Sequence, residues 1–234
     1  GLRNEGVREW NYSLRGLSDR ELQAAAQYAC EREIWDRCIN TSERTRNEID
    51  VEQRFPTPLR QEVSARAREI GLDPAFVYGL IRQESRFILD ARSVVGASGL
   101  MQLMPATAKW TAKKIGLAYS GSGINDRDTN LRLGNAYLKL VLDEVGGSQA
   151  MAAAAYNAGP GRPRKWREGP VLDAVAWVEG IPFPETRDYV KKVLSNSTYY
   201  AMILGSKGTT IRSRLGRSIG PPDPNAPPPN KDLP

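Results

Sequence analysis

The sequence has 234 residues, of which 40% are hydrophobic and 26% charged, with a formal net charge of +6 and a pI near 9.4. These values are ordinary for a globular protein of one or two domains and argue against a fibrous or membrane-spanning chain. No uncharged apolar run approaches the roughly 20 residues that cross a bilayer, and the first residues carry no apolar signal core.

The chain contains no histidine. This excludes histidine-dependent catalytic triads and histidine metal ligands, and two cysteines alone argue against a zinc site. We therefore expect no metal and no cofactor, and proton transfer must fall to other titratable side chains. Basic residues alternate with acidic ones and form no run interleaved with aromatics, so we expect no nucleic-acid binding.

The first 55 residues predict two short helices, over 18–29 and 35–45. Ser18 followed by Glu21 has the spacing of a capping box at the start of the first helix. Two short helices cannot enclose a core alone, so we interpret this segment as the end of a helical array or a docking layer. Cys30 and Cys38 are too far apart to bridge within one continuous helix, where the rise between them is roughly 12 Å. A turn between them would allow a disulfide, and the sequence leaves both possibilities open.

Prolines make residues 51–58 a predicted linker, after which helical periodicity dominates. Asp128 is the predicted cap of a long helix, and the alanine-rich stretch should be central because small residues let helices approach closely. No strand alternation appears, so the sequence predicts an all-α fold. The predicted helices cover 59–70, 74–87, 105–116, 128–146, 150–156 and 184–204.

The chain becomes rich in proline and glycine from Gly216 onward. Such a composition cannot form a core, so we predict an extended, mobile tail that acts as a linker. A role in recognition is the alternative.

Glu84 falls on the apolar face set by Val77, Leu80 and Ile81 in the predicted 74–87 helix. A carboxyl group on an apolar face is desolvated, which raises its pKa and lets it donate a proton near neutral pH. The alternative is an ordinary glutamate that is partly exposed or paired with Arg82 or Arg86.

Two later segments are also unusual. Gln102 lies among large apolar residues after a glycine-rich turn, where its amide could bind a polar ligand or simply bond the backbone. Tyr156 and Asn157 lie where an alanine-rich helix breaks at Gly159. Tyr156 could hydrogen-bond a carboxylate, or it could belong to the core at a plain helix end.

Four segments together resemble the soluble lytic murein transglycosylases, in that family's order and spacing. They are Glu84-Ser85-Arg86-Phe87, then Gly96-Ala97-Ser98-Gly99-Leu100-Met101-Gln102-Leu103-Met104-Pro105, then Ala155-Tyr156-Asn157-Ala158-Gly159, and finally Ile181-Pro182-Phe183-Pro184-Glu185-Thr186-Arg187 with Tyr189-Val190. The resemblance implies a lysozyme-like, goose-type helical catalytic domain over residues 56–206. A remnant of an α-superhelix would precede it over 1–55, and a proline-rich tail would follow over 207–234.

The resemblance also implies cleavage of the β-1,4 bond between N-acetylmuramic acid and N-acetylglucosamine in peptidoglycan, with a 1,6-anhydro product. Glu84 would be the single general acid and base, which fits the lack of an obvious second carboxylate of the kind that ordinary glycosidases use. Tyr156 would orient Glu84 or the substrate's acetamido group. The expected substrate-binding residues are Ser93, Gln102, Met104, Tyr156, Asn157 and Glu185. Glu185 has an alternative role as a first-turn carboxylate that favours the helix dipole.

Two other functions remain open at this point. One is hydrolysis of peptidoglycan, in which water replaces the substrate hydroxyl, and the other is a non-catalytic murein-binding or assembly module. Since peptidoglycan lies outside the cytoplasmic membrane, we expect a periplasmic location in the envelope of a Gram-negative bacterium. The expected partners are peptidoglycan glycan strands and, beyond these, cell-wall synthesis or envelope-assembly proteins.

Overall fold

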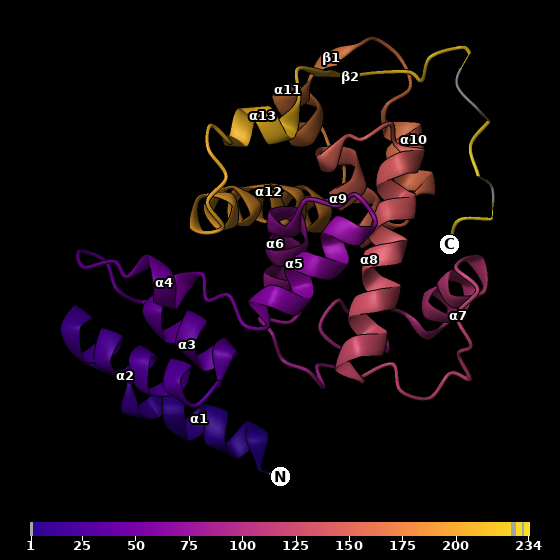
Figure 1. The fold of residues 1–234 in the computed structure, drawn as a ribbon. Coiled ribbons are helices and arrows are strands. Elements are labelled where there is room, and N and C mark those ends of the chain that lie inside the picture. Colours follow the sequence, from indigo (N-terminus) through magenta and orange to yellow (C-terminus); the bar gives the residue numbers. More distant parts are fainter. Residues whose placement is uncertain (1, 226–227, 231) are drawn as a thin grey trace. The chain divides into compact units, whose positions relative to one another are not determined.

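The computed structural model describes residues 2–225, 228–230 and 232–234, and Gly1, Ala226, Pro227 and Lys231 lie outside the described residues (Figure 1). The fold is mostly helical, which confirms the predicted all-α class. Within the described residues, no helix is both long and apolar enough to span a membrane. Contacts divide the chain into two compact units, residues 1–58 with 86–88 and residues 59–85 with 89–234.

The first unit contains the four helices α1 (Arg3–Ser13), α2 (Asp19–Glu31), α3 (Trp35–Ser42) and α4 (Val51–Arg54). Ser18 and Glu21 form the predicted capping box of α2. The chain turns sharply between α2 and α3, where Glu33 has a φ of 57°. This turn brings Cys30 and Cys38 together in a disulfide with Cα atoms 5.0 Å apart, which resolves the question that the sequence left open.

The second unit is built around α9 (Gln149–Ala158), whose alanines at 150 and 152–155 are fully buried. The prediction of a central alanine-rich helix is confirmed, since α9 packs against α8, α10 and α12. The other elements of this unit are α5 (Arg60–Glu69), α6 (Pro74–Glu84), α7 (Pro105–Lys114), α8 (Arg127–Glu144), α10 (Gly161–Trp166), β1 (Leu172–Asp173), α11 (Ala174–Glu179), α12 (Pro184–Ile203), α13 (Ile211–Leu215) and β2 (Ser218–Ile219).

The crossing of α6 and α12 depends on Gly79. A Cβ atom at this position would lie 2.1 Å from Ser197 Oγ and 2.8 Å from the backbone of α12, at Ser197 N and Val193 O. Only glycine permits this approach, because backbone atoms cannot move aside as a flexible side chain can. The close contact brings the C-terminal end of α6 against the first half of α12.

Helix α6 ends at Glu84, three residues earlier than the sequence predicted. Arg86 and Phe87 have φ angles of 50° and 66°, and a left-handed backbone cannot continue a right-handed helix. Glu84 is therefore the last helical residue, and it lies where a loop begins.

The cap of α8 also differs from the prediction. Asp126 rather than Asp128 caps the helix, and its side chain accepts a hydrogen bond from the backbone N–H of Thr129. Asp128 lies one position into the first turn, where a carboxylate also favours the helix dipole.

Helices α1 and α4 were not predicted, and α4 lies within residues 51–58, which the sequence assigned to a linker. The short elements α10, α11, α13 and the antiparallel pair β1 and β2 were not predicted either. Each of the helices α10, α11 and α13 has five or six residues, fewer than two turns, so the sequence shows no periodicity to detect.

The C-terminal segment differs from the mobile tail that the sequence predicted. Arg214 in α13 is buried and bonds Asp73 at 2.8 Å and Gln149 at 3.0 Å. Strand β2 pairs with β1, and the described residues beyond it return to α8 and α10 (Figure 1). Hydrogen bonds and strand pairing with other parts of the second unit thus hold the C-terminal segment, although this segment has no hydrophobic core of its own.

Candidate active site

Glu84 presents its partly buried carboxyl group to α12. The hydroxyl of Tyr189, whose side chain is buried, donates a hydrogen bond of 2.5 Å to Glu84 Oε1. The two residues meet because α6 and α12 cross closely at Gly79. The carboxyl group is thus held in one orientation by a neutral donor.

The environment of Glu84 raises its pKa to about 7, against an ordinary value of 4.5. Burial is the larger cause because it disfavours the charged form, while the hydrogen bond from Tyr189 acts in the opposite direction. With this pKa, both the protonated and the ionised form of the carboxyl group are populated near neutral pH, so the group can serve as acid and as base.

The neighbouring arginines have other partners. Arg82 is buried and donates to Asn196 Oδ1 at 3.1 Å, and Arg86 forms an ion pair of 3.2 Å with Glu43. The alternative of an ordinary ion-paired glutamate is not favoured, since the hydrogen bond that orients Glu84 comes from a phenol.

The glycine-rich segment forms a fixed loop beside this carboxyl. Ser85, next to Glu84, donates to the backbone oxygen of Leu100 at 2.7 Å. Asn130 of α8 accepts from the N–H of Met101 at 2.8 Å and donates to the oxygen of Ser98 at 3.0 Å. These bonds tie the loop to both α6 and α8.

Gln102 uses its side-chain N–H₂ group to brace this loop. It donates to the backbone oxygens of Gly99 at 2.8 Å and Ala91 at 3.0 Å, and its own backbone has a φ of 45°. The backbone-bonding alternative is therefore realised for the amide nitrogen. Binding of substrate by the remaining amide oxygen stays a prediction.

Burial is the main cause of the raised pKa of the Tyr156 phenol, and the charge of the nearby Glu84 carboxylate adds to the rise. Its hydroxyl donates to the backbone oxygen of Met101 at 2.8 Å. From the sequence we expected Tyr156 to orient either Glu84 or the acetamido group of the substrate. In the structure, the direct hydrogen bond to Glu84 comes from Tyr189 instead. Tyr156 fastens the loop to α9 beside the carboxyl.

A hydrogen bond between α9 and α12 joins Asn157 to the first turn of α12, which also carries Glu185. The buried Thr186 hydroxyl donates to Asn157 Oδ1 at 2.7 Å. Glu185, the residue before Thr186, is exposed in the first turn of α12 and lies one turn ahead of Tyr189. Its position is compatible both with a role at the site and with the helix-dipole alternative.

Ser93 and Met104 lie at the two ends of the loop. Ser93 closes a turn in which its Oγ accepts from the N–H of Ala97 at 3.0 Å, and Met104 is the exposed residue that precedes α7. Their roles as substrate-binding residues stay predictions.

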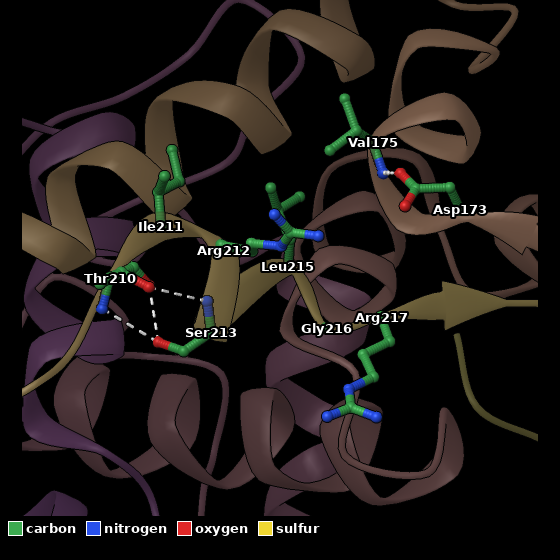
Figure 2. Close-up of a pocket in the computed structure, with 9 residues that line it drawn as sticks. All are labelled: Asp173, Val175, Thr210, Ile211, Arg212, Ser213, Leu215, Gly216 and Arg217. Carbon is green, nitrogen blue, oxygen red and sulfur yellow. Dashed lines mark hydrogen bonds between the residues drawn. The ribbon is translucent and has the colours of Figure 1, made fainter.

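A separate pocket of about 1030 Å³ lies between α13, with the residues that flank it, and the junction of β1 with α11 (Figure 2). None of the predicted site residues lines it. The hydroxyl groups of Thr210 and Ser213 cap α13, and the Asp173 carboxylate accepts from the N–H of Val175. These polar groups are already used by the fold, so this pocket is not the candidate active site.

In the described part of the chain, no three acidic, cysteine or histidine side chains gather as metal ligands would.

Sequence reasoning did not assign roles to Tyr189 or Tyr137. Tyr189 belongs to the last of the four motif segments, and its position four residues after Glu185 places both on one face of α12. Tyr137 gave no such signal, because an aromatic residue on the buried face of a long helix is ordinary core.

The helical fold and the Glu84 carboxyl, which accepts a hydrogen bond from Tyr189 at the end of α6, define a helical domain of the lysozyme-like class. Residues 62–170 match the family described as the transglycosylase SLT domain, and residues 180–208 match the soluble lytic transglycosylase helical domain. The chain belongs to the soluble lytic murein transglycosylase family. The second match covers all of α12 and none of residues 1–55, so the assignment of residues 1–55 to a superhelix remnant stays a prediction.

Similar proteins cover almost the whole chain. The soluble lytic murein transglycosylase of Escherichia coli is 37% identical over 214 residues, which are 90% of this chain and 33% of that protein. A crystal structure of an inactive mutant of lytic transglycosylase Slt from Pseudomonas aeruginosa has a TM-score of 0.84 at 38% identity and covers 92% of this chain and 35% of that one. The 70 kDa soluble lytic transglycosylase of Escherichia coli has a TM-score of 0.81 at 35% identity, over 92% and 36% of the two chains. The chain thus spans about a third of the length of the relatives it matches.

Proposed function

We propose that this chain is a peptidoglycan lytic transglycosylase that cleaves the β-1,4 bond between N-acetylmuramic acid and N-acetylglucosamine and leaves 1,6-anhydro-muramic acid ends. The observation that carries the proposal is the Glu84 carboxyl, partly buried, held by Tyr189 and with a pKa raised to about 7. This is the state that a single residue needs to act first as acid and then as base.

In the first step, protonated Glu84 gives its proton to the glycosidic oxygen while the bond from that oxygen to muramic acid C1 breaks. The N-acetyl oxygen of the substrate stabilises the positive charge at C1. In the second step, the C6 hydroxyl oxygen attacks C1 and the Glu84 carboxylate takes its proton. Glu84 ends protonated as it began, and no water is consumed.

The neighbouring groups support this sequence of steps. Tyr189 donates to the Glu84 carboxyl and stabilises the anion between the two steps, and burial keeps the phenol itself neutral because it raises the pKa of Tyr189 well above 10. A neutral partner suits a residue that must alternate between two protonation states better than a fixed cation does, because a cation would hold the carboxylate charged.

The remaining predicted residues are proposed to bind the glycan. Gln102 and Met104 would contribute from the loop, Tyr156 and Asn157 from the end of α9, and Ser93 and Glu185 from the outer parts of the site. Support comes from the bonds that connect their elements, between Tyr156 and Met101 and between Asn157 and Thr186.

The relatives add independent support. The Pseudomonas aeruginosa protein named above was crystallised as an inactive mutant in which a glutamate is replaced by glutamine. A third structure, similar at a TM-score of 0.78 and 35% identity, is a complex of the 70 kDa soluble lytic transglycosylase with bulgecin A. Both of these proteins are named as lytic transglycosylases.

The test is mass spectrometry of the soluble fragments released from purified peptidoglycan. We expect the wild type to release fragments with 1,6-anhydro ends, one water lighter than lysozyme products, and Glu84→Gln to be at least about 10³-fold slower because it can neither give nor accept the proton. Glu69→Gln, at an exposed glutamate of α5, is the matched control and should keep wild-type activity.

The other outcomes identify the rival functions. Fragments with reducing ends would make the protein a hydrolase with the same acid. Binding of peptidoglycan without release by either protein would indicate a murein-binding or assembly module.

We further propose a periplasmic location in a Gram-negative envelope, because the substrate lies there, and contact with cell-wall synthesis or envelope-assembly proteins. An oxidising compartment fits the Cys30–Cys38 disulfide. Affinity capture with the full chain and with residues 56–234 would show whether such partners need the first 55 residues, and capture that is the same with both would count against that role.

A further inference from the structure

The described residues 228–230 and 232–234, which we call the C-terminal strap, are held by an ion pair on the rest of the second unit, which we call the catalytic unit. Glu144 at the end of α8 accepts from the backbone N–H of Asn230 at 3.1 Å, and Arg164 of α10 donates to the backbone oxygen of Asn230 at 3.0 Å. The two charged groups also pair with each other at 2.6 Å, and both are largely buried. This clamp holds both polar groups of one peptide residue, whatever its side chain.

A second anchor lies at the end of the strap. The hydroxyl of Tyr137, in the middle of α8, donates to the backbone oxygen of Pro234 at 2.7 Å. Tyr137 is only 5% exposed, and Leu233 beside this bond is also buried. Figure 1 shows this end of the chain beside α8. The strap therefore supplies the acceptor for a hydroxyl that has little access to water.

Tyr137 connects the strap to the site. Its ring lies 5.4 Å from the ring of Tyr156, centroid to centroid, at an interplanar angle of 55°. Tyr156 in turn holds the loop through its hydrogen bond to Met101. The charge of Glu84 contributes to the raised pKa of Tyr156, after burial. The path from Pro234 to the Glu84 carboxyl therefore consists of a hydrogen bond to Tyr137, a ring contact between Tyr137 and Tyr156, and an electrostatic interaction between Tyr156 and Glu84.

We propose that Tyr137 is a positioning residue for the reaction and that the C-terminal strap holds it in place. The inference rests on the proposed function. A buried hydroxyl that loses its acceptor must move or take up water, and interiors packed at this density pass such a displacement to the adjoining ring. Tyr156 would then lose its fixed place beside Glu84, and the loop with it.

The experiment compares the full chain with Tyr137→Phe, with a chain that ends at Pro229, and with the two changes combined. We expect each single change to lower kcat about tenfold with KM within about twofold, because a small displacement at the reacting group affects the chemical step more than binding. The combined variant should lose no more than the worse single variant, since both changes remove the same bond. Tyr119→Phe, which removes an exposed hydroxyl bonded to Gly121, is the matched control.

The outcomes separate the possible roles of the strap. A lower Tm with unchanged kcat would show that the strap only stabilises the fold, and a rise in activity on truncation would show an inhibitory segment. Either result overturns the inference while leaving the proposed function intact.

A second measurement does not depend on activity. In protein labelled with ¹³C in the tyrosine rings, removal of the strap should move the resonances of Tyr156 and Tyr189 and leave that of Tyr28 in α2 in place. If no chain releases glycan fragments, the proposed function fails, but these spectra still decide the positioning role. Unmoved Tyr156 and Tyr189 signals would overturn it.

Discussion

Glu84 has a pKa that results from two opposing effects on one carboxyl group. Burial raises it toward 7, and the Tyr189 hydrogen bond limits the rise. For a residue that donates a proton in one step and accepts one in the next, a value near the working pH gives both forms a usable population. Tyr189 therefore adjusts acidity as well as orientation.

The substitution Tyr189→Phe separates the effect of burial from that of the hydrogen bond on the pKa of Glu84, because it keeps the aromatic ring and removes the hydroxyl donor. The pKa of Glu84 should rise further, and since the first step needs the protonated acid, the loss of activity at high pH should begin about one pH unit later than in the wild type. The maximal rate should fall about tenfold, because the carboxylate of the second step loses its partner. The pH dependence of fragment release measures both.

The matched control for this substitution is Tyr12→Phe, at an exposed tyrosine of α1. A shift of the alkaline limb to lower pH in Tyr189→Phe would contradict the assigned role, since it would mean that the phenol favours the protonated form of Glu84.

At the scale of elements, the site depends on the crossing of α6 and α12. Gly79→Ala places a methyl group against Ser197 Oγ and against backbone atoms of α12 that cannot yield. We expect the free energy of unfolding to fall by about 1–3 kcal/mol from this overpacking. The residual folded protein should be less active, because the displaced α12 carries Tyr189 away from Glu84.

Urea unfolding and fragment release check this prediction. Gly6→Ala is the matched control, since Gly6 lies inside α1 and its added Cβ would meet no atom within 4 Å. The control should be neutral or more stable by up to about 1 kcal/mol, because alanine favours a helix over glycine. Equal behaviour of the two variants would show that the crossing tolerates a wider spacing.

The same elements show how much of the fold could be predicted from the sequence. Periodicity and caps are local, so they located α2, α6, α9 and α12, and the apolar face of α6 identified Glu84. The end of α6 was placed too late because the left-handed backbone of Arg86 and Phe87 has no glycine or proline to announce it. The sequence did not identify Tyr189 as the hydrogen-bond partner of Glu84, because the two residues are more than 100 positions apart and their pairing depends on helix packing that no local pattern encodes.

At the scale of the whole molecule, the two units rely on different sources of stability. The second unit buries a continuous core around α9, whereas the first has four helices and few fully buried side chains. Small units of this kind commonly need a covalent link in addition to their core. The Cys30–Cys38 disulfide joins α2 to α3 in the first unit.

Replacement of both cysteines by alanine should therefore destabilise residues 1–58 and leave the catalytic unit folded. The chain-entropy model gives about 2–3 kcal/mol for a loop of this length, and the loss of packing at the fully buried Cys38 adds to it. Hydrogen exchange resolved by peptide should show faster exchange in α2 and α3, with protection of α9 and α12 unchanged. Wild-type protein treated with a reductant serves as the comparison, since it breaks the same bond without changing the sequence. Unchanged exchange in α2 and α3 in both samples would mean that helix packing alone maintains the first unit, and equal loss of protection in α9 would mean that the two units unfold together.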